Sequence, residues 1–159
     1  MNNAAAVNSG KLREHLEQDI GLDVSNVDLQ KIIDVLIARE TSIESFEDLA
    51  AATAAMITVH ETHFLRHTDH FTWLTEHWLP QQVANGAIHL NILSAGCSTG
   101  EEPYSLSAQL LQAAKPYLLN INIDACDINS HSLQIAKQGK YGLWSLRGVD
   151  VGREQEWLD

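Results

Sequence analysis

The stretch of residues 93–105 constrains the fold of this chain more than any other feature. It reads Leu-Ser-Ala-Gly-Cys-Ser-Thr-Gly-Glu-Glu-Pro-Tyr-Ser and begins at the end of a short apolar run, residues 88–94. An apolar run of this length that leads into glycine predicts a buried strand and a turn. Pro103 stands where the first turn of a helix tolerates proline, so a helix is expected to follow the turn.

The same order of elements recurs further along the chain. Residues 119–125 alternate between apolar and polar side chains, which predicts a second strand. Ser130 is then expected to cap a helix that Gly139 stops. Strand, helix, strand, helix is typical of a parallel α/β sheet, so residues 86–159 predict an α/β domain.

Two strands do not complete a doubly wound sheet, because such a sheet needs further strands and helices to cover its edges and both faces. The α/β part is therefore expected to be an incomplete Rossmann-like domain, or one that relies on something outside this chain. The exposed edge of its sheet predicts self-association when the chain is used alone.

The first half of the chain is expected to be helical. Residues 1–10 are small and polar and predict a disordered tail. Apolar spacing and capping residues predict helices over residues 11–20, from Ser25 to about residue 39, and from Ser45 to about residue 56. Residues 11–82 are therefore expected to form a helical N-terminal domain and a linker helix.

The linker helix is predicted over residues 58–79. Apolar side chains recur there at helical spacing, at Phe64, Phe71, Leu74 and Trp78. Pro80 is expected to close this helix, because proline lacks the backbone N–H that a helix interior needs.

The composition excludes several classes of function. The formal net charge is −11, from 10 basic and 21 acidic residues, which argues against nucleic acid as a partner. No apolar run is long enough to cross a bilayer and no secretory signal is present, so no membrane insertion is expected. The two cysteines, Cys97 and Cys126, lack metal-binding spacing and are expected to be reduced thiols in a cytoplasmic protein.

The glycine-containing turn is expected to bind a ligand, because ligands of parallel α/β sheets bind at the carboxyl ends of the strands. Gly96 and Gly100 allow a ligand to approach the backbone closely. A phosphate is disfavoured, since neither P-loop nor dinucleotide-binding glycine pattern is present and Glu101 and Glu102 occupy its place. The two carboxylates suit a cationic ligand such as S-adenosylmethionine, or they only complement the helix macrodipole.

Two further residues are candidates for ligand binding. Asp127 ends the second predicted strand, where an acid can accept hydrogen bonds from ribose hydroxyls. Alternatively, Asp127 or Asn129 starts a turn or caps the next helix. Arg66 is the one basic residue between Arg39 and Lys115, and it can form an ion pair or steer a carboxylate substrate.

Together these segments resemble the family of CheR-type chemotaxis-receptor glutamate methyltransferases. The family carries Thr-x-Phe-Phe-Arg, then Cys-Ser-Thr-Gly-Glu-Glu-Pro-Tyr-Ser, then Asp-Ile-Asp/Asn. This chain has Thr-His-Phe-Leu-Arg at residues 62–66, the full second motif at residues 97–105, and Asp-Ile-Asn at residues 127–129. Residues 141–147 resemble a later Tyr and Leu/Phe-Arg segment, so the likeness covers residues 58–147.

The resemblance implies an S-adenosylmethionine-dependent methyltransferase that forms methyl esters on glutamates of a methyl-accepting chemoreceptor or similar signalling protein, with S-adenosylhomocysteine as the product. By position, it implies Arg66 as the catalytic residue beside the methyl donor and the incoming carboxylate. His60 stands where relatives often have Asn. The residues that the resemblance implies for cofactor binding are His60, Thr62, Arg66, Gly96, Glu102, Asp127 and Ile128.

Two alternatives remain open at the level of the sequence. The first alternative is a truncated or degenerate module that binds a cofactor or a partner without turnover. It rests on the observation that the chain ends near the middle of the family's catalytic domain. The second alternative is a histidine-rich helix that binds zinc. This alternative rests on the near-helical spacing of the histidines. The segment is one residue short of the HExxH pattern of metalloproteases, so no dedicated metal site is expected. The histidines concerned are His60, His63, His67, His70 and His77.

Overall fold

The computed structural model describes residues 9–38, 43–58 and 61–149. The chain divides into two compact units, Met1–Val59 and His60–Asp159. Most of the expected tail, residues 1–8, lies outside the described residues, as do residues 150–159. In the described part of the chain, no helix is long and apolar enough to cross a membrane.

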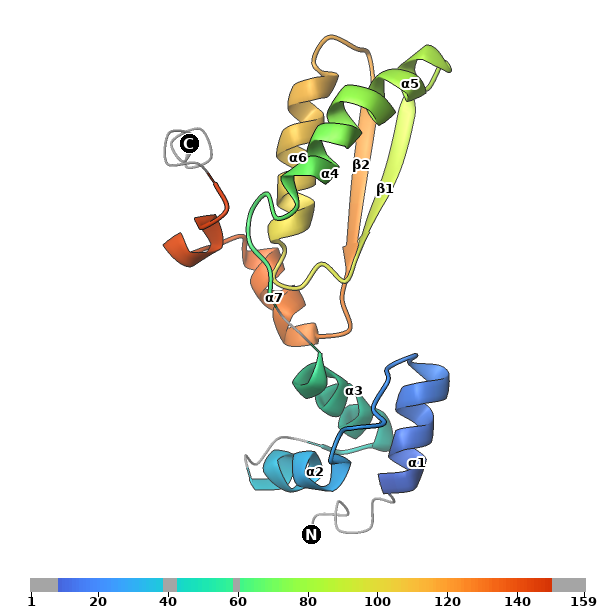
Figure 1. The fold of residues 1–159 in the computed structure, drawn as a ribbon, viewed down its shortest axis with the longest axis vertical. Helices are drawn as coiled ribbons and strands as arrows, with labels where there is room; N and C mark the ends of the chain where they lie inside the picture. Colours follow the sequence, from blue (N-terminus) through green and yellow to red (C-terminus); the bar gives the residue numbers. More distant parts are fainter. Residues whose placement is uncertain (1–8, 39–42, 59–60, 150–159) are drawn as a thin grey trace. The chain divides into compact units, whose positions relative to one another are not determined.

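The first unit is helical, as predicted (Figure 1). Its elements are α1 (Ser9–Glu14), which continues as the π-helix η2 (His15–Asp19), α2 (Leu29–Ala38) and α3 (Phe46–Ile57). Their apolar faces meet in a core of fully buried aliphatic side chains, because burial of such faces is what stabilises short helices. The most buried members of this core are Leu12, Leu16, Val24, Leu49, Ala50 and Ala54.

The predicted start of the second helix at Ser25 is wrong. Asp28 provides the side-chain acceptor at the start of α2, where its Oδ1 accepts a hydrogen bond from Lys31 N–H at 3.1 Å. Ser25 lies in the preceding turn, and its N–H donates to Asp23 Oδ1 at 3.0 Å. Both Ser and Asp are good capping residues, so the local pattern did not determine which of the two begins the helix.

Helix α3 begins beside Ser45, where the sequence predicts a helix start, and Ser45 caps it through a reciprocal capping box. Ser45 Oγ accepts from Asp48 N–H and Asp48 Oδ2 accepts from Ser45 N–H, both at 3.0 Å. We expect Ser45→Ala to destabilise the first unit by about 1 kcal/mol. A urea titration followed at α3 amide resonances measures this loss. Ser130→Ala is the control and should change stability by less than about 0.5 kcal/mol, because Ser130 is exposed and does not cap its helix.

The second unit contains all the predicted α/β elements. One long helical segment comprises α4 (Thr68–Trp73), the π-helix η3 (Leu74–Trp78) and α5 (Leu79–Ala84). It leads to β1 (His89–Ala95), α6 (Glu101–Ala114), β2 (Asn120–Cys126), α7 (Ser130–Gln138) and the 3-10 helix η4 (Leu143–Leu146).

The two strands of this unit are parallel, as the sequence predicts. They pair in register from His89 opposite Asn120 to Ala95 opposite Cys126, and α6 is the crossover between them (Figure 1). Helix α6 contacts β2, η3 and α5. The buried core of the unit includes Phe71 and Leu79 from the long helical segment, Leu90 from β1, and Leu106 and Leu110 from α6. This core fixes the carboxyl ends of both strands and the N-terminus of α6 relative to one another.

The linker helix does not begin near residue 58. Residues 64–67 form a turn, and the helix starts only at Thr68. Leu65 and His67 have left-handed backbones, with φ of 56° and 61°. Left-handed residues cannot continue a right-handed helix, so the apolar spacing of this segment predicted its buried face but not its backbone.

Two further expectations about helix ends are wrong. Pro80 does not close the linker helix but stands in the first turn of α5, directly after a π-helix in which Leu79 N–H reaches five residues back to Leu74 O. Wider π-type turns of this kind are a known irregularity at which helices accommodate a disruption. Helix α7 is capped by Asn129, whose Oδ1 accepts from the N–H groups of His131 and Ser132, and Ser130 is its first residue.

Candidate active site

The turn after β1 lies at the carboxyl ends of both strands. The N–H groups of Gly96 and Cys97 both donate to Cys126 O, at 2.8 and 2.9 Å, so the end of β2 holds the start of the turn. Gly96 is exposed with φ of 79°, and a Cβ placed on it would meet no atom within 4 Å. The backbone at Gly96 is therefore open to a ligand. The same expectation for Gly100 is wrong, because Gly100 is buried and packed against Tyr141 and Ala136.

Asp127 connects this turn with the end of β2. Its Oδ2 accepts from Ser98 N–H at 2.7 Å and its Oδ1 from Asn129 N–H at 2.8 Å. Each carboxylate oxygen can accept more than one hydrogen bond, so the half-buried side chain retains capacity for ligand hydroxyls. Ile128 presents an exposed apolar side chain directly beside it. Ser98, whose φ is 49°, has a buried Oγ without a hydrogen-bond partner in the described structure.

The two glutamates at the start of α6 have different environments. Glu101 is only 3% exposed, and its carboxylate accepts from Thr99 Oγ1 at 2.6 Å and from Ser145 Oγ at 2.8 Å. Glu102 is exposed, and its Oε1 accepts from Ser94 Oγ at 2.6 Å. Of the two carboxylates that the sequence offers to a cationic ligand, the structure leaves only Glu102 accessible.

The segment that carries Arg66 is held against the rest of the unit by its backbone. Arg66 is exposed and its guanidinium donates to Glu61 O within the same segment. Thr62 is half-buried, and its carbonyl accepts from Arg147 at 3.0 Å. His60 lies outside the described residues.

Two hydrogen bonds tie this segment to distant parts of the sequence. Phe64 N–H donates to Ser145 O at 2.8 Å, in η4, and Leu65 N–H donates to Ser105 Oγ at 3.0 Å, in α6. The structure thereby brings the Arg66 turn to the N-terminal part of α6. Ser105 and Ser145 were not singled out by the sequence. Only its place in the nine-residue motif could have indicated a role for Ser105. A serine at a helical position does not by itself indicate a tertiary contact.

Tyr141 and Cys97 lie in the site but keep their protons. Tyr141 donates to Thr99 O at 2.8 Å, and burial, with the Glu101 carboxylate, raises the pKa of its phenol well above the usual value. Burial is the main cause that raises the pKa of the Cys97 thiol, and the negative charge of Asp127 is the second. A neutral thiol and a neutral phenol are poor nucleophiles, so these side chains pack and donate rather than react.

The histidine-rich segment does not form a metal site in the described residues, where no group of three or more His, Cys, Asp or Glu side chains could hold an ion. His67 and His70 stack on each other with ring centroids 5.2 Å apart. His63 and His67 precede α4, so helical spacing does not place them on one face with His77. The structure does not favour the metal-binding alternative.

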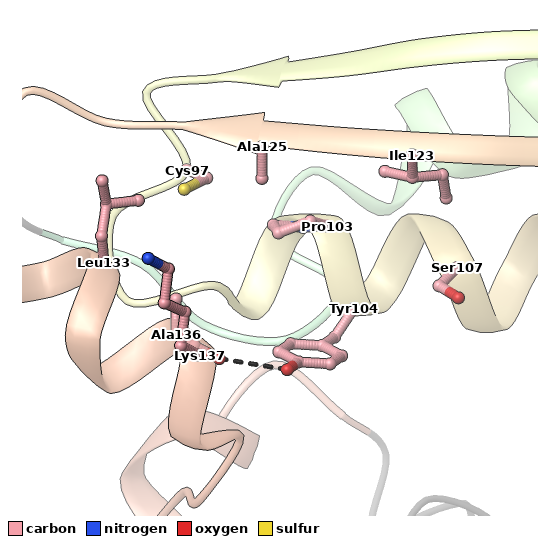
Figure 2. Close-up of a pocket in the computed structure, with 9 residues that line it drawn as sticks. All are labelled: Cys97, Pro103, Tyr104, Ser107, Ile123, Ala125, Leu133, Ala136 and Lys137. Carbon is pink, nitrogen blue, oxygen red and sulfur yellow. Dashed lines mark hydrogen bonds between the residues drawn. The ribbon is translucent and has the colours of Figure 1, made fainter.

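A groove of about 320 Å³ lies between β2, α6 and α7 (Figure 2). Its lining is mainly aliphatic, and Tyr104 at its edge donates to Ala136 O at 3.0 Å. None of the residues expected to bind the cofactor lines it. The candidate cofactor site is therefore the open surface at Gly96, Glu102 and Asp127 rather than this groove.

A parallel strand–helix–strand unit with an open glycine turn and an acid at the end of its second strand defines a nucleoside-binding α/β domain. Residues 60–159 match the family model described as CheR methyltransferase, SAM binding domain. The chain belongs to this methyltransferase family, whose cofactor is S-adenosylmethionine. The incomplete Rossmann-like fold that the sequence predicts is confirmed, and the described residues fit the cofactor through the open backbone at Gly96 and the carboxylates of Glu102 and Asp127.

Curated relatives agree with this assignment. The chain is 31% identical to a "Probable biofilm formation methyltransferase WspC" of Pseudomonas putida, over 96% of this chain and 39% of that protein. It is 37% identical to "Chemotaxis protein methyltransferase 1" of Pseudomonas aeruginosa, over 65% of this chain and 40% of that protein. It is 32% identical to the "Chemotaxis protein methyltransferase" of Vibrio parahaemolyticus, over 86% of this chain and 50% of that protein. The chain thus spans half or less of the length of these relatives.

Proposed function

We propose that this protein transfers a methyl group from S-adenosylmethionine to glutamate side chains of a chemoreceptor or a similar signalling protein. The observation that carries the proposal is the junction at Asp127, which joins the turn after β1 to the end of β2 beside an open glycine backbone. The names of the relatives, chemotaxis and biofilm methyltransferases, support the class of substrate.

The described residues divide the binding of the cofactor among them. Asp127 accepts hydrogen bonds from the ribose hydroxyls, and the exposed side chain of Ile128 contacts an apolar part of the ligand. Glu102, the accessible carboxylate at the start of α6, attracts the ammonium group. By their positions in the family motif, Thr62 and Arg66 complete the set, together with His60, which lies outside the described residues.

The reaction needs alignment more than acid–base chemistry. When bound, S-adenosylmethionine supplies an electrophilic methyl group on its sulfonium. A glutamate carboxylate is already ionised at neutral pH and is a competent nucleophile without a general base. Arg66 orients that carboxylate with its forked donors, and the fixed turn and strand ends supply the remaining positioning. The neutral Cys97 and Tyr141 offer no competing nucleophile.

The first test is a calorimetric titration of the purified chain with S-adenosylhomocysteine, followed by transfer of a labelled methyl group from S-adenosylmethionine to a receptor fragment. Saturable binding and base-labile methylation of the fragment are expected. Binding without methylation assigns the chain to the alternative, a cofactor-binding module without turnover. A folded chain that binds no S-adenosylhomocysteine contradicts the cofactor assignment of these 159 residues.

The variant Glu102→Gln tests whether the Glu102 carboxylate takes part in binding the cofactor. We expect it to weaken binding of S-adenosylmethionine about tenfold, because the carboxylate pairs with a cationic group of the ligand. The matched control is Glu47→Gln, since Glu47 is an exposed glutamate at the second position of α3, as Glu102 is at the second position of α6. If Glu102 only complements the helix macrodipole, both variants lose similar stability and binding is unchanged.

A further inference from the structure

A chain of hydrogen bonds links the turn that carries Arg66 to Glu101. We propose that Glu101, through Ser105 and Ser145, is a positioning residue that holds Arg66 in place for methyl transfer. This inference rests on the proposed function, because only that proposal gives Arg66 a task in methyl transfer. It assigns no contact between Glu101 and a ligand. It gives the two adjacent glutamates of the motif separate tasks, with Glu102 at the surface facing the ligand and Glu101 inside.

The Arg66 turn depends on bonds from outside itself. Leu65 and His67 flank Arg66, and both have left-handed backbones, with φ of 56° and 61°. This conformation is unfavourable for residues with a Cβ, and it persists only where the surrounding structure imposes it. The turn is therefore a place where distant residues determine the direction of an exposed side chain.

Two serines impose this conformation on the turn. Phe64 N–H donates to Ser145 O at 2.8 Å and Leu65 N–H donates to Ser105 Oγ at 3.0 Å. The side chains of Phe64 and Leu65 are each only 7% exposed, so water cannot replace these bonds easily. Arg66 follows directly in the sequence, and its position depends on where these two N–H groups are held.

Both serines are in turn bonded to Glu101, Ser145 through the carboxylate and Ser105 through the backbone carbonyl. Ser145 Oγ donates to Glu101 Oε1 at 2.8 Å, and Ser105 Oγ donates to Glu101 O at 2.6 Å. The other carboxylate oxygen, Oε2, accepts from Thr99 Oγ1 at 2.6 Å in the turn after β1. One buried carboxylate thus connects the cofactor-binding turn with η4. A hydrogen bond to a charged group is stronger than one between neutral groups.

Two variants separate positioning from a direct effect of charge. Ser145→Ala removes the link to Oε1 and leaves the carboxylate in place. Glu101→Gln removes the charge but keeps hydrogen-bonding atoms at both ends of the side chain, so both serine links can persist. Ser107→Ala is the matched control, because Ser107 is a half-buried serine of α6 outside this network, as Ser145 is half-buried within it.

The first measurement is amide hydrogen exchange of the chain without ligand. Ser145→Ala should speed exchange at Phe64 and Leu65 about tenfold while the β1–β2 amides stay protected. Glu101→Gln should largely keep the protection that these amides have in the native chain, and Ser107→Ala should leave both amides unchanged. Unchanged exchange at Phe64 and Leu65 in Ser145→Ala overturns the proposal, whatever the chain binds.

The second measurement is a double-mutant cycle on S-adenosylmethionine affinity. Ser145→Ala should weaken binding about tenfold in the native chain but less than about twofold in an Arg66→Ala background, because its effect passes through Arg66. Additive effects overturn the proposal and leave the proposed function standing. If the native chain binds no S-adenosylmethionine, the proposed function fails, and the exchange measurement alone decides whether Glu101 positions the turn.

Discussion

Gly100→Ala is expected to destabilise the second unit by about 3 kcal/mol or more. Gly100 precedes α6 with φ of 99°, a conformation that alanine rarely adopts. A Cβ at this position would come within 2.7 Å of Tyr141 Oη and within 2.8 Å of Ala136 Cβ. Backbone strain and overlap act together, because the turn is packed directly against α7.

Urea or thermal unfolding, followed at resonances of α6 and β2, measures the loss. Gly86→Ala is the matched control, since Gly86 has φ of 82° but an added Cβ would meet no atom within 4 Å. This control should lose only about 1 to 2 kcal/mol, the cost of the left-handed backbone. Equal losses in the two variants would mean that the turn before α6 does not approach α7 as closely as described.

Asp127→Ala is expected to lower the affinity for S-adenosylhomocysteine about a hundredfold. The variant removes the acceptor assigned to the ribose hydroxyls. It also releases the N–H groups of Ser98 and Asn129, which the carboxylate holds at 2.7 and 2.8 Å. The second unit should therefore lose about 1 to 3 kcal/mol of stability as well, because the turn after β1 is no longer joined to the end of β2.

Calorimetric titration gives the affinity, and unfolding without ligand gives the stability. Asp124→Ala is the control, since Asp124 is exposed, lies three residues earlier on β2, and accepts from Asn122 Nδ2 at 3.0 Å. It should bind as the native chain does. Native affinity in a folded Asp127→Ala variant would remove Asp127 from the binding site and leave it as a purely structural link between the two turns.

Local patterns in the sequence determined the α/β part of the fold and the position of its ligand-binding turn. The apolar runs before Gly96 and Asp127 became β1 and β2, paired in parallel, and α3 began beside Ser45 as expected. These features depend on neighbours a few residues away, through hydrophobic periodicity, glycine conformation and capping hydrogen bonds. For that reason a single sequence contains enough information to predict them.

The family motif extended this prediction to the cofactor and to a set of expected binding residues. Motif position assigned Glu102, and not Glu101, to the cofactor, but it contained no information about the environment of either carboxylate. The structure buries Glu101 in a hydrogen-bond network and leaves Glu102 at the surface. It also shows that Asp127 joins two turns, a task compatible with binding a ribose.

Only the tertiary structure decided the conformation around Arg66. Apolar spacing predicted a helix there, whereas Leu65 and His67 adopt left-handed backbones in a turn. The bonds that impose this turn come from serines 40 residues after Leu65, at Ser105, and 81 residues after Phe64, at Ser145. Local propensity contains no information about such partners, because the chain must first bring α6 and η4 to the Arg66 turn before the bonds can form.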